Sequence, residues 1–139
     1  MAKNILSLFL VLMLVIIWKI NCEEETLKSV MEKIIQDLQT DQEDLEKNGP
    51  IKRDDVRSNI RTILDKDLYY AQEHLGEDLS EENEEKGEKI LDEIRENLEN
   101  DYNDLQHTSS KEQFFKIADN LKDAENKSKS IIALIPNKD

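Results

Sequence analysis

The chain is poor in the residues that usually cross-link a small domain or carry its chemistry. Its 139 residues include one cysteine, two histidines, three glycines and two prolines. One cysteine cannot form an internal disulfide, and two histidines offer few ligands for a metal site. The few glycines form no Gly-rich loop of the kind that cradles phosphate. A packed hydrophobic core must therefore stabilise the folded chain.

Positive charge is also scarce. The chain has 19 Lys and Arg residues against 32 Asp and Glu residues, which gives a net charge of −13. Phosphate backbones and anionic lipid headgroups repel a chain of this charge. We therefore expect no nucleic-acid partner.

The N-terminus has the pattern of a secretory signal peptide. Lys3 precedes the stretch 5–17, which is apolar except for one serine. This run of about 13 residues is shorter than a membrane span, and Lys19 interrupts it, which disfavours the alternative of an uncleaved anchor. We predict a signal peptide over 1–22 and a secreted, extracellular domain over 23–139 with no stable membrane anchor.

Removal of the signal peptide makes the remaining chain more acidic. It would take away the only cysteine and two lysines but no acidic residue, so the net charge becomes about −15. Repulsion between carboxylates raises their pKa values in the folded state. We therefore expect stability to rise as the pH falls from 7 toward 5.

Four stretches of similar length, 26–47, 52–75, 81–106 and 110–135, have the periodicity of amphipathic helices. They are separated by Asn48-Gly49-Pro50, by 76–80 and by 107–109, where Gly49 suits a left-handed helix end. Their apolar stripes comprise Leu27, Val30, Met31, Ile34, Leu38 and Leu45; Val56, Ile60, Ile63, Leu64, Leu68, Ala71 and Leu75; Ile90, Leu91, Ile94, Leu98, Tyr102 and Leu105; and Phe114, Ile117, Ala118, Leu121, Ala124, Ile131 and Ile135.

These helices predict an all-α fold, specifically a monomeric antiparallel four-helix bundle. Ser80 is placed to cap the third helix, and either Ser109 or Ser110 forms a capping box before the fourth. Two features weaken the pattern, because the first stripe is interrupted at Asp41 and Gly87 lies near the start of the third helix. A three-helix core with one mobile helix is the alternative.

No arrangement of residues indicates catalysis, a metal site or a cofactor. His74 and His107 have no sequence-local partners that would make a catalytic group. The stretch 101–112 has acids at the first and last positions of a calcium loop, but Gln106 replaces the glycine that such a loop requires. We therefore expect a non-enzyme with no catalytic residues, no metal ligands and no cofactor.

Three residues are candidates for interaction or modification. Counting 100° per residue places Tyr69 and Phe115 on the polar sides of their helices, where an exposed aromatic side chain can anchor a protein partner. Both side chains could also be ordinary surface residues or lie partly in the core. Asn126 begins the sequence Asn-Lys-Ser, a possible N-glycosylation site in a secreted protein.

The signal-peptide pattern, the absence of cysteine from 23–139, and the abundance of Glu, Asp, Asn, Lys and Ile give the chain a general resemblance. It resembles the small secreted salivary or effector proteins of feeding arthropods and other parasites. That resemblance implies delivery into a host and binding of a host protein to alter defence or trafficking. The expected function is thus a secreted protein-interaction protein, and the alternative is a carrier of lipid or a small apolar ligand between the helices.

Overall fold

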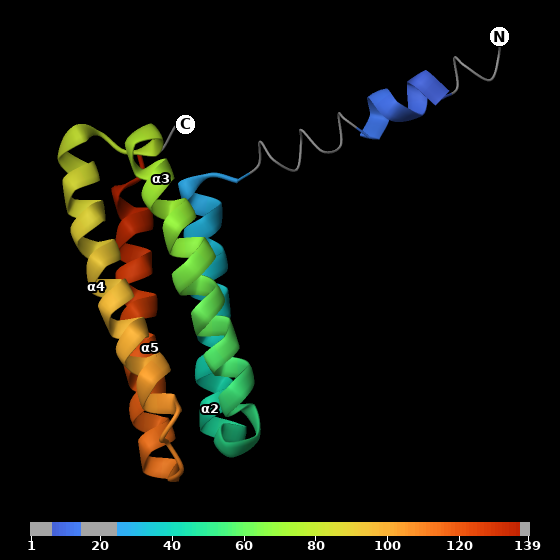
Figure 1. Ribbon diagram of the computed structural model, residues 1–139. Coiled ribbons are helices and arrows are strands. Elements are labelled where there is room, and N and C mark those ends of the chain that lie inside the picture. The colour runs from blue at the N-terminus through green and yellow to red at the C-terminus, as the bar shows by residue number, and fades with distance from the viewer. Residues whose placement is uncertain (1–6, 15–24, 137–139) are drawn as a thin grey trace.

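The computed structural model describes residues 7–14 and 25–136, and that part of the chain is helical and contains no strand. The main elements are α2 (Leu27–Thr62), η1 (Ile63–Asp67), α3 (Leu68–Asp78), α4 (Glu81–Leu105) and α5 (Lys111–Leu134). Figure 1 shows them side by side as long rods. The all-α prediction is confirmed, and four helices pack against one another.

The N-terminal prediction falls mostly on residues that the structure does not describe. Residues 7–14 form a short helix with exposed apolar side chains, whereas the cleavage point before Glu23 lies outside the described residues. Among the helices that the structure describes, none is both long enough and apolar enough to cross a membrane.

The helix α2 consists of two arms that meet at Asn48. This residue has non-helical backbone angles (φ −143°, ψ 44°), and Pro50 two residues later has no N–H to continue the helical ladder. The chain reverses there, so the first arm (27–47) and the second arm (49–62) lie side by side at the lower end of Figure 1.

Gly49 has a different role from the expected one. We expected a left-handed glycine at the helix end, but no glycine among the described residues has a positive φ. Gly49 is buried against Phe114 of α5, and a Cβ atom at Gly49 would lie 2.6 Å from the Phe114 ring. Glycine is needed at this turn because the ring occupies the space of a side chain.

The second arm continues through η1 into α3. The prediction of a regular α-helix over 52–75 is wrong at Ile63–Asp67, where the chain forms a π-helical turn. The N–H of Leu68 bonds to the carbonyl of Ile63, five residues back. Such turns are rare and are often found at functional sites.

The core lies between four helical rods. They are the first arm of α2, its second arm continued by η1 and α3, then α4, and then α5. α5 packs extensively on α2 and on α4, whereas α3, within the described part of the chain, packs on α4 and not on α5. The buried hydrophobic residues form one cluster. Gly87 is buried because Leu75 and Leu79 pack against it, leaving a Cβ only 3.0–3.1 Å from their side chains.

The two halves of the chain share a sequence pattern that the structure makes visible. The two arms of α2 form the first hairpin, and α4 with α5 forms the second. Two leucines and two aspartates near the end of the first helix of each hairpin recur at a separation of sixty positions. The paired residues are Leu38 with Leu98, Asp41 with Asp101, Asp44 with Asp104, Leu45 with Leu105, and, on the returning helices, Asn59 with Asn120. Each hairpin therefore pairs one buried aspartate with an asparagine on its second helix.

The helix starts are capped as the sequence indicates. Ser80 accepts a hydrogen bond from the N–H of Asn83, and Ser110 with Gln113 forms a reciprocal capping box. Of the two serines proposed for α5, Ser110 is the cap, while the N–H of Ser109 donates to Gln113 Oε1 at 3.1 Å. α2 begins with a further capping box between Thr26 and Ser29.

Candidate functional site

Two carboxyl groups lie inside the helical packing. Asp41 and Asp101 are almost completely buried, and each accepts one hydrogen bond, from Asn59 Nδ2 at 2.9 Å and from Asn120 Nδ2 at 3.2 Å. Among the described residues, neither Oδ2 atom has a hydrogen-bond partner. Burial raises the pKa of each carboxyl to about 7, against the lowering effect of its asparagine. Both groups therefore change charge near neutral pH.

Two further acids contact the core with cationic partners. Asp67, at the end of η1, lies 3.6 Å from Lys33 Nζ, and burial raises its pKa. Glu125 of α5 accepts hydrogen bonds from Gln42 and Gln39 and pairs with Lys129 at 2.8 Å. Burial acts to raise the pKa of Glu125, but these bonds together lower it. Glu125 thus links α5 to the first arm of α2.

Exposed aromatic side chains gather on α3. Tyr69 is 59% exposed, as the helical count predicts, and the adjacent Tyr70 is 39% exposed. The Tyr70 ring stacks on His74 with a centroid distance of 5.4 Å. Glu73 forms a hydrogen bond with the Tyr69 hydroxyl and raises its pKa. We call Tyr69, Tyr70 and His74 the tyrosine face.

A surface cavity adjoins the tyrosine face. It has a volume of about 310 Å³ and lies between the start of α2 and the junction of η1 with α3. Tyr70 and Val30 give it apolar walls, while charged side chains, including Lys33 and Asp67, also line it. Asp67 Oδ2 has no hydrogen-bond partner among the described residues. The cavity therefore offers both an aromatic wall and a buried acceptor.

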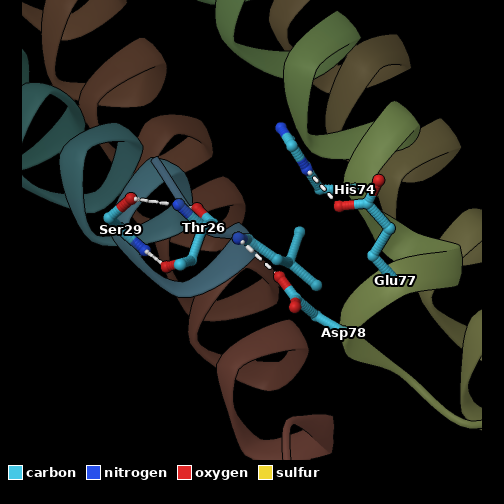
Figure 2. A network of polar contacts seen from close by, with 6 residues as sticks. Thr26, Ser29, His74, Glu77 and Asp78 are labelled. Carbon is cyan, nitrogen blue, oxygen red and sulfur yellow. Dashed lines mark hydrogen bonds and ion pairs between the residues drawn. The ribbon is translucent and has the colours of Figure 1, made fainter. Parts of the chain in front are cut away.

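Polar contacts beside the tyrosine face connect the start of α2 with the end of α3. Figure 2 shows Thr26 and Ser29 in their reciprocal capping box. Asp78 at the end of α3 accepts a 2.9 Å hydrogen bond from the N–H of Leu27, where a carboxylate is favoured by the positive end of α2. His74 Nδ1 lies 3.1 Å from Glu77 Oε2 in the same view. These contacts join the beginning of α2 to the end of α3.

Phe115 lies far from the tyrosine face. It is 40% exposed near the start of α5, and Lys111 Nζ lies 5.8 Å from its ring centroid. That start is at the opposite end of the rods from the end of α3 (Figure 1), and the described parts of α3 and α5 do not pack on each other. The structure therefore does not combine Tyr69 and Phe115 into one surface.

Asn126 is exposed on α5, within a regular helix. The sequon's third residue, Ser128, is buried and donates a 2.8 Å hydrogen bond to the carbonyl of Ala124. In the folded protein the sequon is therefore not in the extended loop that is typical of accessible sequons. Attachment of a glycan to Asn126 stays a prediction and would have to precede folding.

The two histidines lie in different parts of the fold, His74 on α3 and His107 after the end of α4. His107 lines a separate cavity of about 240 Å³ with Asp104 and Lys116. Within residues 7–14 and 25–136, no group of three His, Cys, Asp or Glu side chains is placed to hold a metal ion.

A function for this chain has to be argued from its own residues, because the comparisons with known proteins found no match. No protein-family model, no curated protein and no solved structure matches the chain.

The three buried aspartates were not expected, although the sequence contains the same signal for each of them. Asp41 lies between Leu38 and Leu45, and Asp101 lies between Leu98 and Leu105, at the spacing of core positions. Asp67 lies between Leu64 and Ala71 at the same spacing. Asp41 was expected to interrupt the first stripe, and Asp101 was considered only as the first position of a rejected calcium loop.

Proposed function

We propose that the protein is a secreted, non-catalytic interaction protein, and that its helices form an antiparallel four-helix bundle which presents the tyrosine face to a protein partner. The resemblance to salivary effectors makes a host protein the expected class of partner, bound outside the cell or after delivery into a host. The bundle supplies a rigid support, and short connections place its helices in alternating directions.

The observation that carries the proposal is the pairing of exposed tyrosines with an adjoining cavity. Tyr69 and Tyr70 are both exposed, and Tyr70 also lines the cavity of about 310 Å³. Tyrosine is enriched among the residues that dominate binding energy, and such residues usually lie beside pockets that exclude water. A tyrosine ring also loses little conformational entropy when a partner covers it.

The charge of the chain indicates the character of the partner. A net charge of about −15 on residues 23–139 repels acidic surfaces at long range and accelerates encounters with basic ones. We therefore expect a partner with a basic contact surface and an association rate that decreases with added salt.

The test begins with capture of partners from host extracellular fluid, followed by variants measured against the captured protein. Tyr69→Ala and Tyr70→Ala should each weaken binding by roughly 30-fold or more, the equivalent of about 2 kcal/mol for a hot-spot residue. The melting temperature of Tyr69→Ala should stay near that of the wild type, because the Tyr69 side chain is 59% exposed.

Phe115→Ala is the matched control, since it also removes an exposed aromatic ring but at the other end of the rods. Loss of binding with Phe115→Ala alone would move the site to the start of α5. Unchanged binding by all three variants would refute a role for these aromatic residues. N-terminal sequencing of exported protein tests the secretory part, with Glu23 as the expected first residue.

Carriage of an apolar ligand is the alternative function, and it requires an apolar cavity between the helices. The cavities described have volumes of about 120–350 Å³, and charged side chains contribute to the lining of each. The core residues themselves form one packed cluster. These observations favour the interaction protein, and recovery of bound lipid with the purified protein would support the carrier.

A further inference from the structure

A small cavity between α4 and α5 is lined entirely by carboxylate and amide side chains. Its volume is about 120 Å³, and its lining residues are Asn97, Asn100, Asp101, Asn120 and Asp123. Both α4 and α5 supply side chains to it, so the packing of the second hairpin fixes its shape. The cavity lies on a different pair of helices from the tyrosine face.

The group that gives this cavity a specific chemistry is Asp101. Its side chain is 1% exposed, it lines the cavity, and no described residue forms a hydrogen bond with its Oδ2 atom. A buried carboxylate oxygen without a partner is costly, because desolvation is not repaid by a hydrogen bond. A bound cation would repay that cost.

Two of the three asparagine side chains donate hydrogen bonds to the carboxylates of the cavity. Asn120 Nδ2 donates to Asp101 Oδ1 at 3.2 Å, and Asn97 Nδ2 donates to Asp123 Oδ2 at 3.2 Å. With the nitrogen of each of these amides used by a carboxylate, the carbonyl oxygen is the remaining ligand atom. Carboxylate and amide oxygens in irregular arrangements of six to eight ligands suit Ca²⁺, which also accepts water as a ligand.

We propose that the cavity formed by Asn97, Asn100, Asp101, Asn120 and Asp123 binds a calcium ion, with Asp101 as its buried ligand and water completing the coordination. Each water occupies about 30 Å³, so the cavity of about 120 Å³ has room for the ion with a few waters. Lys127 pairs with Asp123 Oδ2 at 3.2 Å and would compete with the ion. Two carboxylates with one competing lysine make a weak site, with a dissociation constant on the order of 10⁻⁴–10⁻³ M, as in extracellular calcium modules.

The first hairpin contains a natural control for this proposal. Asp41 and Asn59 repeat the buried pair, but threonines stand at the positions equivalent to Asn100 and Asp123. Those threonines, Thr40 and Thr62, donate their hydroxyl groups to carbonyls of their own helix. The first hairpin therefore has the buried aspartate among different side chains, with Asp37 at the position equivalent to Asn97.

The test is calorimetric titration of the chelator-treated protein with CaCl₂ and with MgCl₂, together with melting temperatures in each salt. We expect one calcium site and a higher melting temperature in calcium than in magnesium at equal concentration. Asp101→Asn should weaken calcium binding at least tenfold, whereas Asp41→Asn should leave it unchanged. Asp123→Asn should also weaken it, and this exposed residue can be changed without disturbing the core.

Lys127→Met should strengthen calcium binding, because it removes the competing cation. The proposal would be overturned by any of three results. These are no heat of binding for calcium beyond that for magnesium, equal effects of the two salts on the melting temperature, or unchanged calcium binding in Asp101→Asn. Equal effects of the two salts would indicate cation accumulation on the acidic surface instead. A null result here leaves the tyrosine face untouched, because the partner is measured in a separate binding assay.

Discussion

Replacement of Asp41 by asparagine should remove the loss of stability that this buried carboxyl causes as the pH rises to neutrality. Burial raises the pKa of Asp41 to about 7 from 3.8, and Asn59 donates to its Oδ1. Asparagine has nearly the same shape and keeps an oxygen for that hydrogen bond, but it has no charge to bury. The variant therefore isolates the cost of ionising one core carboxyl.

The sign follows from the raised pKa. Below pH 3.8 the carboxyl is protonated in both the folded and the unfolded chain, and the stability it contributes is fully present. As the pH rises through about 7 the folded state must lose a proton from a buried site, and that stability is lost. Each unit of pKa shift is worth about 1.36 kcal/mol, so wild type should lose about 2.5 kcal/mol between pH 5 and pH 8 through this residue alone.

Asp41→Asn should therefore gain about 2.5 kcal/mol on the wild type between pH 5 and pH 8, and its melting temperature should rise relative to that of the wild type by roughly 5–10 °C over this range. The two proteins should approach equal stability only below pH 3.8, where the carboxyl is protonated in both the folded and the unfolded chain. Circular dichroism melts from pH 5 to pH 8 make the measurement. Asp101 and Asp67 also titrate in both proteins, so the difference between the two curves reports on Asp41.

Asp55→Asn is the matched control, because it removes the same charge from a side chain that is 73% exposed. If repulsion across the acidic surface governed the pH dependence, Asp55→Asn would flatten the curve as much as Asp41→Asn. That outcome, or an unchanged slope in Asp41→Asn, would refute the reasoning from burial. The sequence led us to expect the same direction of pH dependence from repulsion, whereas desolvation is the largest cause at the buried aspartates.

Three further predictions test other parts of the structure. Gly49→Ala should destabilise the fold by about 1–3 kcal/mol in chemical denaturation, since the new methyl group overlaps the Phe114 ring, and an unchanged midpoint would contradict this packing. Ser110→Ala should cost about 1 kcal/mol in thermal unfolding while Ser109→Ala should cost less, because only Ser110 caps α5; equal losses would place the cap elsewhere. Glycosidase treatment of protein secreted by eukaryotic cells should increase its gel mobility if Asn126 carries a glycan, and Asn126→Gln should remove that shift.

The helices and most of the core could be predicted from the sequence because both depend on local periodicity. Leu or Ile at every third or fourth position determines the buried face of a helix wherever its partner lies. The same count placed Tyr69 and Phe115 on exposed surfaces. Capping depends on residues three apart, so Ser80 and Ser110 were also visible in the sequence.

The two cavities depend on contacts between helices, which the periodicity of the sequence does not reveal. The cavity beside Tyr70 depends on the packing of the first arm of α2 against η1 and α3, where Asp67 meets Lys33. The cavity between α4 and α5 depends on the position of α5, which places Asn120 against Asp101. The sequence alone determined the helices, their exposed aromatics and the acidic charge, because each depends on composition or on neighbours within one turn. Only the tertiary structure decided which side chains pair with the buried acids, because those partners lie on other helices or on the other arm of α2.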